Sequence, residues 1–200
     1  MSLLIANKAP DFKATAIMDN HSVNENFILS EYLSGHKGII FFYPLNFTFV
    51  CPSEIIAFNK KIEDFQMRRT KILAVSVDSH FSHLAYRNTD INEGGIGKIN
   101  FPLVSDISKD ISRSYNVLTN QSVACRGTFL IDKNFIIRHQ VINDLSLGRS
   151  VEEAIRMIDA LEAYEKHGEV CPANWRPGKS MIKTSSDGIK NYLRNHLDEI

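Results

Sequence analysis

A cysteine, Cys51, stands where a helix is expected to begin, directly after a turn. An apolar run ends at Pro44, and beyond Cys51 apolar residues recur at the spacing of one helix face. Thr48 is the predicted N-cap, which places Cys51 in the first turn, where Pro52 is tolerated because the first amides lack intrahelical partners. The apolar positions of this helix, which is predicted to run to about Met67, are Ile55, Phe58, Ile62 and Phe65.

A thiol at a helix N-terminus has chemical consequences. The helix end acts as about half a positive charge and favours anions. A free thiol has a pKa of about 8.5, and such sites lower it to roughly 3.5–7.5, which favours the nucleophilic thiolate. A free cysteine is nevertheless often a buried structural residue. Position alone leaves a reactive thiolate and a structural thiol open.

Composition and charge indicate one globular domain with a terminal extension. The chain has 200 residues, of which 44% are hydrophobic and 23% charged, as in soluble folded proteins. Its 23 basic residues balance its 23 acidic ones, and no block of lysine and arginine argues for nucleic-acid binding. The apolar run 3–6 is too short for a signal peptide, and no stretch approaches the roughly 20 apolar residues of a membrane span. We therefore expect a cytoplasmic protein that binds neither nucleic acid nor membrane.

The three cysteines are Cys51, Cys125 and Cys171. An odd, small number without an export signal argues against a framework of structural disulfides. No Cys-x-x-Cys pair occurs, so neither a zinc ribbon nor a dithiol oxidoreductase is indicated. His80 and His83 could share a helix face, but we interpret them as surface or N-terminal helix residues rather than metal ligands.

Strands are predicted to alternate with helices along most of the chain. The strands are expected at 38–43, 72–77, 101–105, and in a hairpin of 128–131 and 135–141. Helices are expected from Asp78 or Ser79 to about Asn88, around Ile107, Ile111 and Tyr115, and from a capping box at Ser150, with Ala154, Ile155, Ile158 and Leu161 facing inward. This order predicts an α/β layered domain with a largely buried, mixed sheet.

The composition changes after about Lys166, where glycine, proline and polar residues dominate. We therefore expect a domain at 1–165 and an extended C-terminal arm at 166–200, with a short helix near 189–197. The arm carries Val170, Cys171, Trp175 and Met181 but no core of its own, so it should pack on something. A second subunit is the natural candidate.

Three blocks carry a specific order of residues: 44–54, 126–132 and 168–175. Within a match that spans nearly the whole chain, they resemble the peroxiredoxins, specifically the typical two-cysteine group that includes the bacterial alkyl hydroperoxide reductase subunit. The resemblance implies a thioredoxin-like layered fold, a mixed central sheet flanked by helices. It also implies a thiol-dependent peroxidase that reduces hydrogen peroxide and alkyl hydroperoxides, with no cofactor and no metal.

The resemblance implies a role for each residue of the block around Cys51. Cys51 would be the peroxidatic thiolate that attacks a peroxide oxygen. Arg126 would keep the thiolate ionised and stabilise the charge on the leaving oxygen. Thr48 would hydrogen-bond the peroxide, and Pro44 would shield the pocket from water.

Two further residues are assigned by the same resemblance. Glu54 would orient Arg126 through a charge-assisted hydrogen bond. Arg149 resembles a second arginine near the site.

Cys171 would be the resolving cysteine, supplied by the partner subunit of an antiparallel homodimer. The sulfenic acid formed on Cys51 would condense with it to an intersubunit disulfide. A disulfide needs a short Cα separation, so local unwinding around Cys51 is expected. A thioredoxin or a flavoprotein reductase would then reduce the disulfide, and the dimers would assemble into a decameric ring.

The chain departs from the family pattern at a few positions. Asn46 stands where the family usually has Asp, and Ser53 where Thr is commoner; neither change removes a catalytic group. The loop at 94–97 resembles one tied to overoxidation, but the terminal pair is Tyr192-Leu193 rather than Tyr-Phe, which puts that sensitivity in doubt. Cys125 fits no catalytic role and is interpreted as a small apolar residue.

Two other function classes are weighed against the peroxidase. One is a Cys-His hydrolase or transferase with His139 as the base, which no sequence context supports. The other is a redox-regulated holdase or scaffold assembly. A hydrolase would ignore peroxide, and a holdase would protect client proteins without consuming it.

Overall fold

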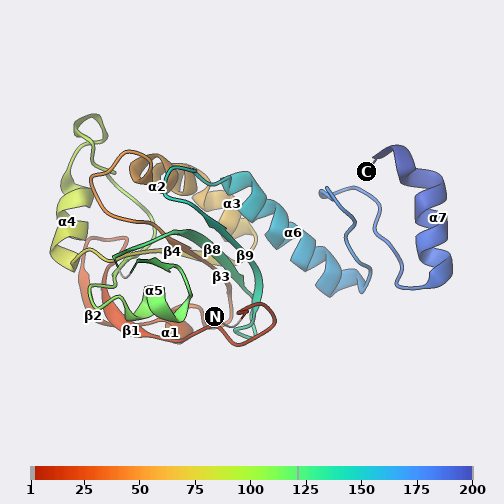
Figure 1. Ribbon diagram of the computed structural model, residues 1–200, viewed down its shortest axis with the longest axis horizontal. Helices are drawn as coiled ribbons and strands as arrows, with labels where there is room; N and C mark the ends of the chain where they lie inside the picture. Colours follow the sequence, from red (N-terminus) through yellow and green to blue (C-terminus); the bar gives the residue numbers. More distant parts are fainter. Residues whose placement is uncertain (1–2, 121, 200) are drawn as a thin grey trace. The chain divides into compact units, whose positions relative to one another are not determined.

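The computed structural model describes residues 3–120 and 122–199 (Figure 1). The chain divides into two compact units, Met1–Val151 and Glu152–Ile200, which we describe separately. Among the described residues, none of the helices combines the length and the apolar character that crossing a membrane requires.

A seven-stranded sheet organises the first unit, with the order β2-β1-β5-β4-β3-β8-β9. Its strands are β1 (Lys13–Ile17), β2 (Val23–Ile28), β3 (Lys37–Phe42), β4 (Thr70–Ser76), β5 (Leu103–Ser105), β8 (Arg126–Ile131) and β9 (Ile137–Asn143). Strand β3 runs parallel to β4 and antiparallel to β8, so the sheet is mixed, as predicted. A separate two-stranded sheet pairs β6 (Leu118–Thr119) with β7 (Val123–Ala124).

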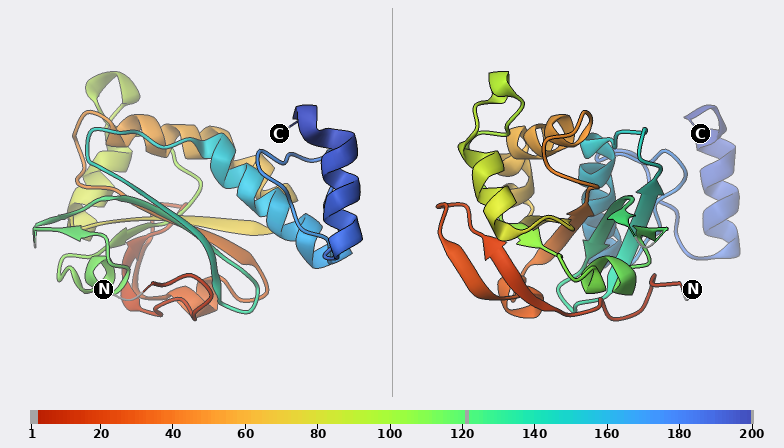
Figure 2. Two further views of the ribbon diagram at one scale, coloured as in Figure 1. Left: turned by 45° about the vertical axis from the view of Figure 1, so that its right-hand side comes forward. Right: turned by 60° about the vertical axis from the view of Figure 1, so that its left-hand side comes forward.

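Helices cover both faces of this sheet. They are α1 (Leu29–Tyr32), α2 (Cys51–Lys60), α3 (Ile62–Met67), α4 (His80–Asn88), α5 (Asp110–Ser114) and the 3-10 turn η1 (Ile91–Glu93). Helices α2 and α3 lie on one face, and α1 and α5 lie on the other (Figures 1 and 2). The α/β layered architecture predicted from the sequence is confirmed.

The central strand β3 is buried along its whole length, which explains its continuous apolar sequence. Alternate side chains point to opposite faces of a strand. The ring of Phe41 stacks on Phe58 of α2 with centroids 4.3 Å apart. The next residue, Phe42, packs against Tyr115 on the opposite side with centroids 5.2 Å apart. Strand β3 therefore anchors both aromatic layers, and its end leads directly into the Cys51 loop.

Several local predictions are corrected by the structure. Thr48 is not an N-cap, because α2 begins at Cys51 with Val50 in the cap position. The predicted helix to Met67 is interrupted at Lys61, whose φ of −103° and ψ of 13° leave the helical range. Ile107 is 67% exposed and precedes α5 instead of lying on its inner face.

Of the two predicted positions for His83, at the surface or near a helix N-terminus, the structure shows the second, because His83 lies in the first turn of α4 and is fully buried. Of the two predicted starts of its helix, Asp78 and Ser79, the structure shows Ser79 as the N-cap, since its side chain accepts a hydrogen bond from the backbone N–H of Ser82.

The second unit holds most of α6 (Val151–His167), followed by an irregular segment, α7 (Ser186–His196) and the 3-10 turn η2 (Leu197–Glu199). The four α6 residues predicted to face inward are buried. In the irregular segment, Val170 pairs with Ile182 in an isolated antiparallel bridge. Trp175 is buried, and its indole N–H donates to the carbonyl of Lys179 at 3.0 Å. The segment is therefore held by local contacts despite its glycines and prolines.

Candidate active site

Cys51 is the first residue of α2, and its side chain is fully buried. The three cysteines are free thiols. Val50, in the N-cap position, provides no side-chain oxygen, so no cap competes for the amides of the first turn. A buried sulfur at an uncapped helix N-terminus lies in the positive end of the helix dipole.

Arg126, the first residue of β8, brings a permanent charge to this sulfur. Its Nη1 lies 3.4 Å from the Cys51 Sγ and donates to Glu54 Oε2 at 2.8 Å. Its Nε donates to the carbonyl of Leu145 at 2.7 Å, which fixes the plane of the guanidinium group. Because β8 runs antiparallel to β3, the start of β8 lies beside the end of β3, where the Cys51 loop begins. Strand pairing thus brings Arg126 to Cys51.

Glu54 and Arg149 form a two-pronged ion pair behind Arg126. The Nε and Nη2 groups of Arg149 donate to Oε1 and Oε2 of Glu54 at 2.8 and 2.7 Å. The Arg149 backbone N–H adds a third bond to Oε1 at 2.9 Å, and its Nη1 donates to the carbonyl of Gly127 at 2.8 Å. Its guanidinium also lies over the Phe41 ring, 5.3 Å from the centroid. Planar two-bond pairing of this kind fixes orientation as well as charge.

The charges of this cluster do not cancel. Burial alone would raise the pKa of Glu54, but the hydrogen bonds and charge of Arg149, followed by the charge of Arg126, outweigh it and lower the pKa. Burial would lower the pKa of Arg126, but its bonds to Cys51 and Glu54 raise it. Glu54 is therefore ionised between two charged arginines. One excess positive charge faces the sulfur and favours an anion there.

The loop between β3 and α2 carries the other two predicted site residues. Pro44 is buried, and Thr48 is partly exposed. The Thr48 hydroxyl donates to the carbonyl of Leu45 at 2.9 Å, so it bonds backward within the loop rather than forward into the helix. Phe47 has a positive φ of 53°, an uncommon conformation for a bulky residue. The six predicted site residues of the first unit therefore come from four places: the loop (Pro44 and Thr48), the start of α2 (Cys51 and Glu54), the start of β8 (Arg126), and the segment before α6 (Arg149).

Two buried tyrosines that the sequence analysis did not single out also lie near the sulfur. Burial raises the pKa of Tyr43 and of Tyr86, and the negative charge of Cys51 contributes to both shifts. Both phenols therefore stay neutral. Apolar positions in a strand and a helix predict only core residues, so no sequence signal distinguished them.

Cys171 lies in the second unit, where it is partly buried. Its Sγ donates to the carbonyl of Ala160 at 3.5 Å. Burial raises the pKa of this thiol, and the charge of Arg156 only partly opposes the shift. Cys171 thus favours the neutral thiol in this conformation.

Cys125 and His139 do not join the Cys51 cluster. Cys125 packs against the core of the first unit, and burial followed by the charge of Asp144 raises the pKa of its thiol. His139 on β9 pairs with Leu130, four residues along β8 from Arg126. At about 3.3 Å per residue, that offset is roughly 13 Å. The arrangement therefore gives His139 no place as a base for Cys51.

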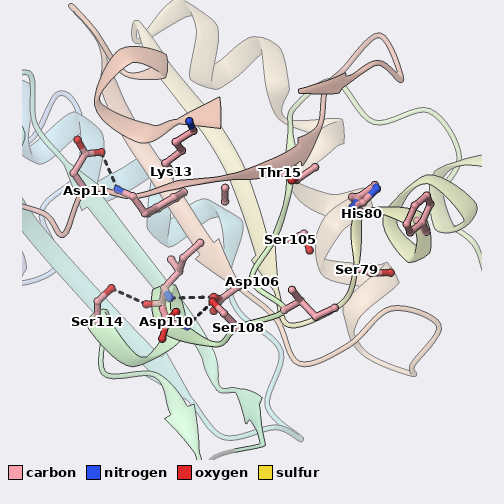
Figure 3. A pocket seen from close by; sticks show the side chains of 15 residues that line it. Asp11, Lys13, Thr15, Ser79, His80, Ser105, Asp106, Ser108, Asp110 and Ser114 are labelled. Atoms are coloured by element: carbon pink, nitrogen blue, oxygen red, sulfur yellow. Dashed lines mark hydrogen bonds between the residues drawn. The ribbon is translucent and has the colours of Figure 1, made fainter. Parts of the chain in front are cut away.

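A cavity of about 700 Å³ opens elsewhere on the first unit. Figure 3 shows its lining, which includes Thr15 of β1, His80 at the start of α4 and the turn around Asp106. The Asp106 carboxylate is occupied by the backbone N–H groups of Ile111 and Ser112, at 3.0 and 2.7 Å. The cavity holds no cysteine and none of the predicted site residues. The candidate active site is therefore the cluster around Cys51, and not this cavity.

Comparison with known families shows to which family this chain belongs. Residues 5–140 match the model of the AhpC/TSA family. The chain belongs to this family. Residues 160–195 also match the C-terminal domain of 1-Cys peroxiredoxin, the segment that contains Cys171. The peroxiredoxin resemblance stated from the sequence is thus confirmed across both units.

Individual relatives agree. This peroxiredoxin is 50% identical over 194 residues to alkyl hydroperoxide reductase C of Helicobacter pylori, covering 97% of this chain and 98% of the relative. It is 50% identical over 191 residues to the chloroplastic 2-Cys peroxiredoxin BAS1 of Hordeum vulgare, covering 95% of this chain and 90% of the relative.

A solved structure confirms the fold. The crystal structure of the reduced 2-Cys peroxiredoxin of Plasmodium vivax has a TM-score of 0.94 and 46% identity, covering 96% of this chain and 100% of the other. The thioredoxin-like fold predicted from the sequence is therefore confirmed. The protein is a thiol peroxidase that reduces peroxides.

Proposed function

We propose that Cys51 is the peroxidatic cysteine. Its thiolate attacks one oxygen of a peroxide ROOH, an S–O bond forms as the O–O bond breaks, and the leaving oxygen takes up a proton to depart as ROH. The sulfur becomes a sulfenic acid. The observation that supports this assignment above all is the single Arg126 nitrogen that contacts both Cys51 and Glu54.

The remaining residues of the cluster prepare that step. Arg126 holds the thiolate and stabilises the negative charge that develops on the leaving oxygen. Glu54 and Arg149 hold Arg126 in place, which is supported by their three hydrogen bonds. The Thr48 hydroxyl, whose proton is used on the carbonyl of Leu45, accepts a hydrogen bond from the O–H of the peroxide. Buried Pro44 keeps water away from the sulfenic acid.

Cys171 is proposed as the resolving cysteine. The thiol of the partner subunit attacks the sulfenic sulfur, an S–S bond forms, and the sulfenic oxygen leaves as water. In this proposal, residues 1–165 form the peroxidase domain, and residues 166–200 form an arm that carries Cys171 to the partner subunit of a homodimer. The substrates would be hydrogen peroxide and alkyl hydroperoxides, and the dimers would close into a decameric ring.

An external dithiol would complete the cycle. A thioredoxin or a flavoprotein reductase would reduce the intersubunit disulfide by thiol–disulfide exchange. The proposed location is the cytoplasm, which cell fractionation followed by immunoblotting would test.

Peroxide consumption with a dithiol reductant tests the assignment of the two cysteines. Cys51→Ser should abolish turnover. Before any dithiol is added, because a dithiol would itself reduce the sulfenic acid, Cys171→Ser should reduce one equivalent of peroxide and form no disulfide-linked dimer on non-reducing electrophoresis. Cys125→Ser is the matched control and should behave as the wild type. Full turnover by Cys51→Ser would show that the mechanism is wrong.

A further inference from the structure

The loop that precedes Cys51 is fastened to α4 through one side chain, Asn46. Asn46 is 7% exposed, and its amide Nδ2 donates to Ser82 Oγ at 2.8 Å. The same Nδ2 lies 3.1 Å from His83 Nδ1. Its Oδ1 accepts from the hydroxyl of Tyr43 at 2.8 Å. Both polar atoms of the side chain are therefore used, on Tyr43, which directly follows β3, and on two residues of α4.

The backbone of Asn46 is fastened as well. Its N–H donates to Asp78 Oδ2 at 2.9 Å, and that carboxylate also accepts from the Ser76 hydroxyl at 2.7 Å. One residue further, the Phe47 ring packs on Tyr86 of α4 with centroids 4.7 Å apart. The left-handed backbone of Phe47 is thus held between a hydrogen-bonded residue and a ring contact.

The protonation of His83 matches the chemistry of Asn46. His83 Nε2 lies 3.1 Å from the carbonyl oxygen of Val104, which only accepts, so Nε2 carries the proton. Burial lowers the pKa of His83 to about 4, so the ring is neutral and Nδ1 is an acceptor. An acceptor at Nδ1 needs a donor opposite, and the Asn46 amide N–H supplies it. A carboxylate in the same place would bond to Nδ1 only if His83 took up a second proton there, which its burial opposes.

This fastening matters because Cys51 is fully buried at the helix start. A disulfide requires a Cα separation of about 4.4–6.8 Å between its two cysteines. A second thiol therefore reaches Cys51 only if the segment around Cys51 opens and exposes the sulfur.

We propose that Asn46 is a positioning residue that latches the Cys51 loop to Ser82 and His83 of α4 and to Tyr43 at the end of β3, and that this latch sets how readily Cys51 opens to form its disulfide. The latch acts through the loop and touches neither the sulfur nor the substrate. The disulfide step rests on the proposed function, whereas the latch itself does not.

Opening is measured on reduced Cys51, without peroxide. In full-length protein with Cys125→Ser and Cys171→Ser, one thiol remains, and the rate of its alkylation by iodoacetamide reports exposure. Asn46→Ala removes three side-chain bonds, so alkylation should accelerate by about tenfold or more. Asn46→Asp keeps the size of the side chain but removes the donor to His83, and at pH 8 it should also accelerate alkylation.

Asn59→Ala is the matched control. Asn59 also makes hydrogen bonds to another segment: its side chain donates to the carbonyl of Lys98 at 3.2 Å and accepts from the N–H of Asn100 at 2.8 Å. It lies at the opposite end of α2 from Cys51. Asn59→Ala should leave alkylation unchanged. Equal alkylation rates in the parent and in both folded Asn46 variants, judged by circular dichroism, would overturn the latch.

The same Asn46 substitutions in the otherwise native chain test the consequence for the disulfide. After one equivalent of peroxide, the intersubunit disulfide should form about tenfold faster in Asn46→Ala, in proportion to the alkylation rate. If alkylation accelerates but no disulfide forms, the proposed resolving step fails and the latch stands. If alkylation does not change, the latch fails whatever the peroxidase does.

Discussion

Arg126 and Cys51 are 75 residues apart in sequence and 3.4 Å apart between Nη1 and Sγ. The contact depends on the antiparallel pairing of β8 with β3, because this pairing places the first residue of β8 beside the end of β3. The guanidinium group has three fixed partners: the sulfur, a carboxylate and a carbonyl. It is therefore preorganised, and stabilising developing charge in such a site requires little reorganisation.

Arg126→Met should slow the reaction of Cys51 with peroxide. Removing one preorganised donor to a developing oxyanion costs about 10²- to 10³-fold in rate. Stopped-flow measurement of the second-order rate constant tests this. Arg113→Met is the control, because Arg113 pairs with Asp110 in an exposed position and should keep the wild-type rate. A rate for Arg126→Met within threefold of the wild type would contradict the role of this arginine.

Glu54→Gln should lower the free energy of unfolding and also slow the reaction of Cys51 with peroxide. The carboxylate is 3% exposed and neutralises one of two buried arginines, and removing one partner of a buried ion pair costs about 3–5 kcal/mol. Urea denaturation gives the free energy of unfolding. Asp110→Asn breaks a pair of the same 2.8 Å length in an exposed position, where the cost is about 1 kcal/mol or less. Similar losses in the two variants would contradict the structural importance of Glu54.

Thr48→Val should reduce the peroxide rate constant while Thr48→Ser retains it. Valine matches the shape of threonine but lacks the hydroxyl that donates to Leu45 and would accept a hydrogen bond from the peroxide. Losing one hydrogen bond between neutral groups costs about 0.5–1.5 kcal/mol, which lowers the rate constant about two- to tenfold. If serine and valine are equally slow, the methyl group of Thr48, and not its hydroxyl, is what the site needs.

His83 should make the protein less stable in mild acid. Burial holds its pKa near 4 in the folded protein, against an ordinary value of 6.5. Between these values the unfolded chain binds the extra proton, so the stability contributed by neutral His83 is complete above pH 6.5 and is lost as the pH falls. The loss between about pH 6.5 and 4.5 should be about 2 kcal/mol in the free energy of unfolding.

The pH window isolates His83 from Glu54. The pKa of Glu54 lies below its ordinary value of 4.5, so the stability from that carboxylate is lost only at lower pH. Urea denaturation at several pH values measures how steeply the free energy of unfolding depends on pH, and His83→Asn should make that dependence weaker between about pH 6.5 and 4.5. A variant with the wild-type slope would assign the acid sensitivity to other groups.

Local patterns in the sequence predicted the α/β architecture and the position of the reactive cysteine. The continuous apolar run of β3 and the periodic apolar residues after Cys51 are direct records of burial, so they marked a strand and a helix start correctly. The motif around Cys51 and the block at Arg126 indicated the family before any geometry was known. The cap of α4 at Ser79 was predicted for the same reason, since capping depends on neighbours in sequence.

Predictions failed where a residue's surroundings come from other elements. Thr48 has the right type for a cap, but the loop turns its hydroxyl back to Leu45. His83 was predicted at the surface or near a helix N-terminus, and the helix position is right. The sequence did not show that its partners come from β5 and the Cys51 loop. No helical periodicity contains this information, because the partners lie 21 and 37 residues away.

The sequence by itself determined the central strands of the sheet and most of the longer helices, the position of the thiol at a helix start, and the family to which the chain belongs. The reason is that burial periodicity, helix capping and motifs depend on residues that are close together in the sequence. Only the tertiary structure decided that Glu54 is shared by two arginines, that one of them reaches the sulfur, and that Asn46 meets a neutral histidine. Those relationships depend on strand order and on the burial of charge, and both arise only when distant segments pack together.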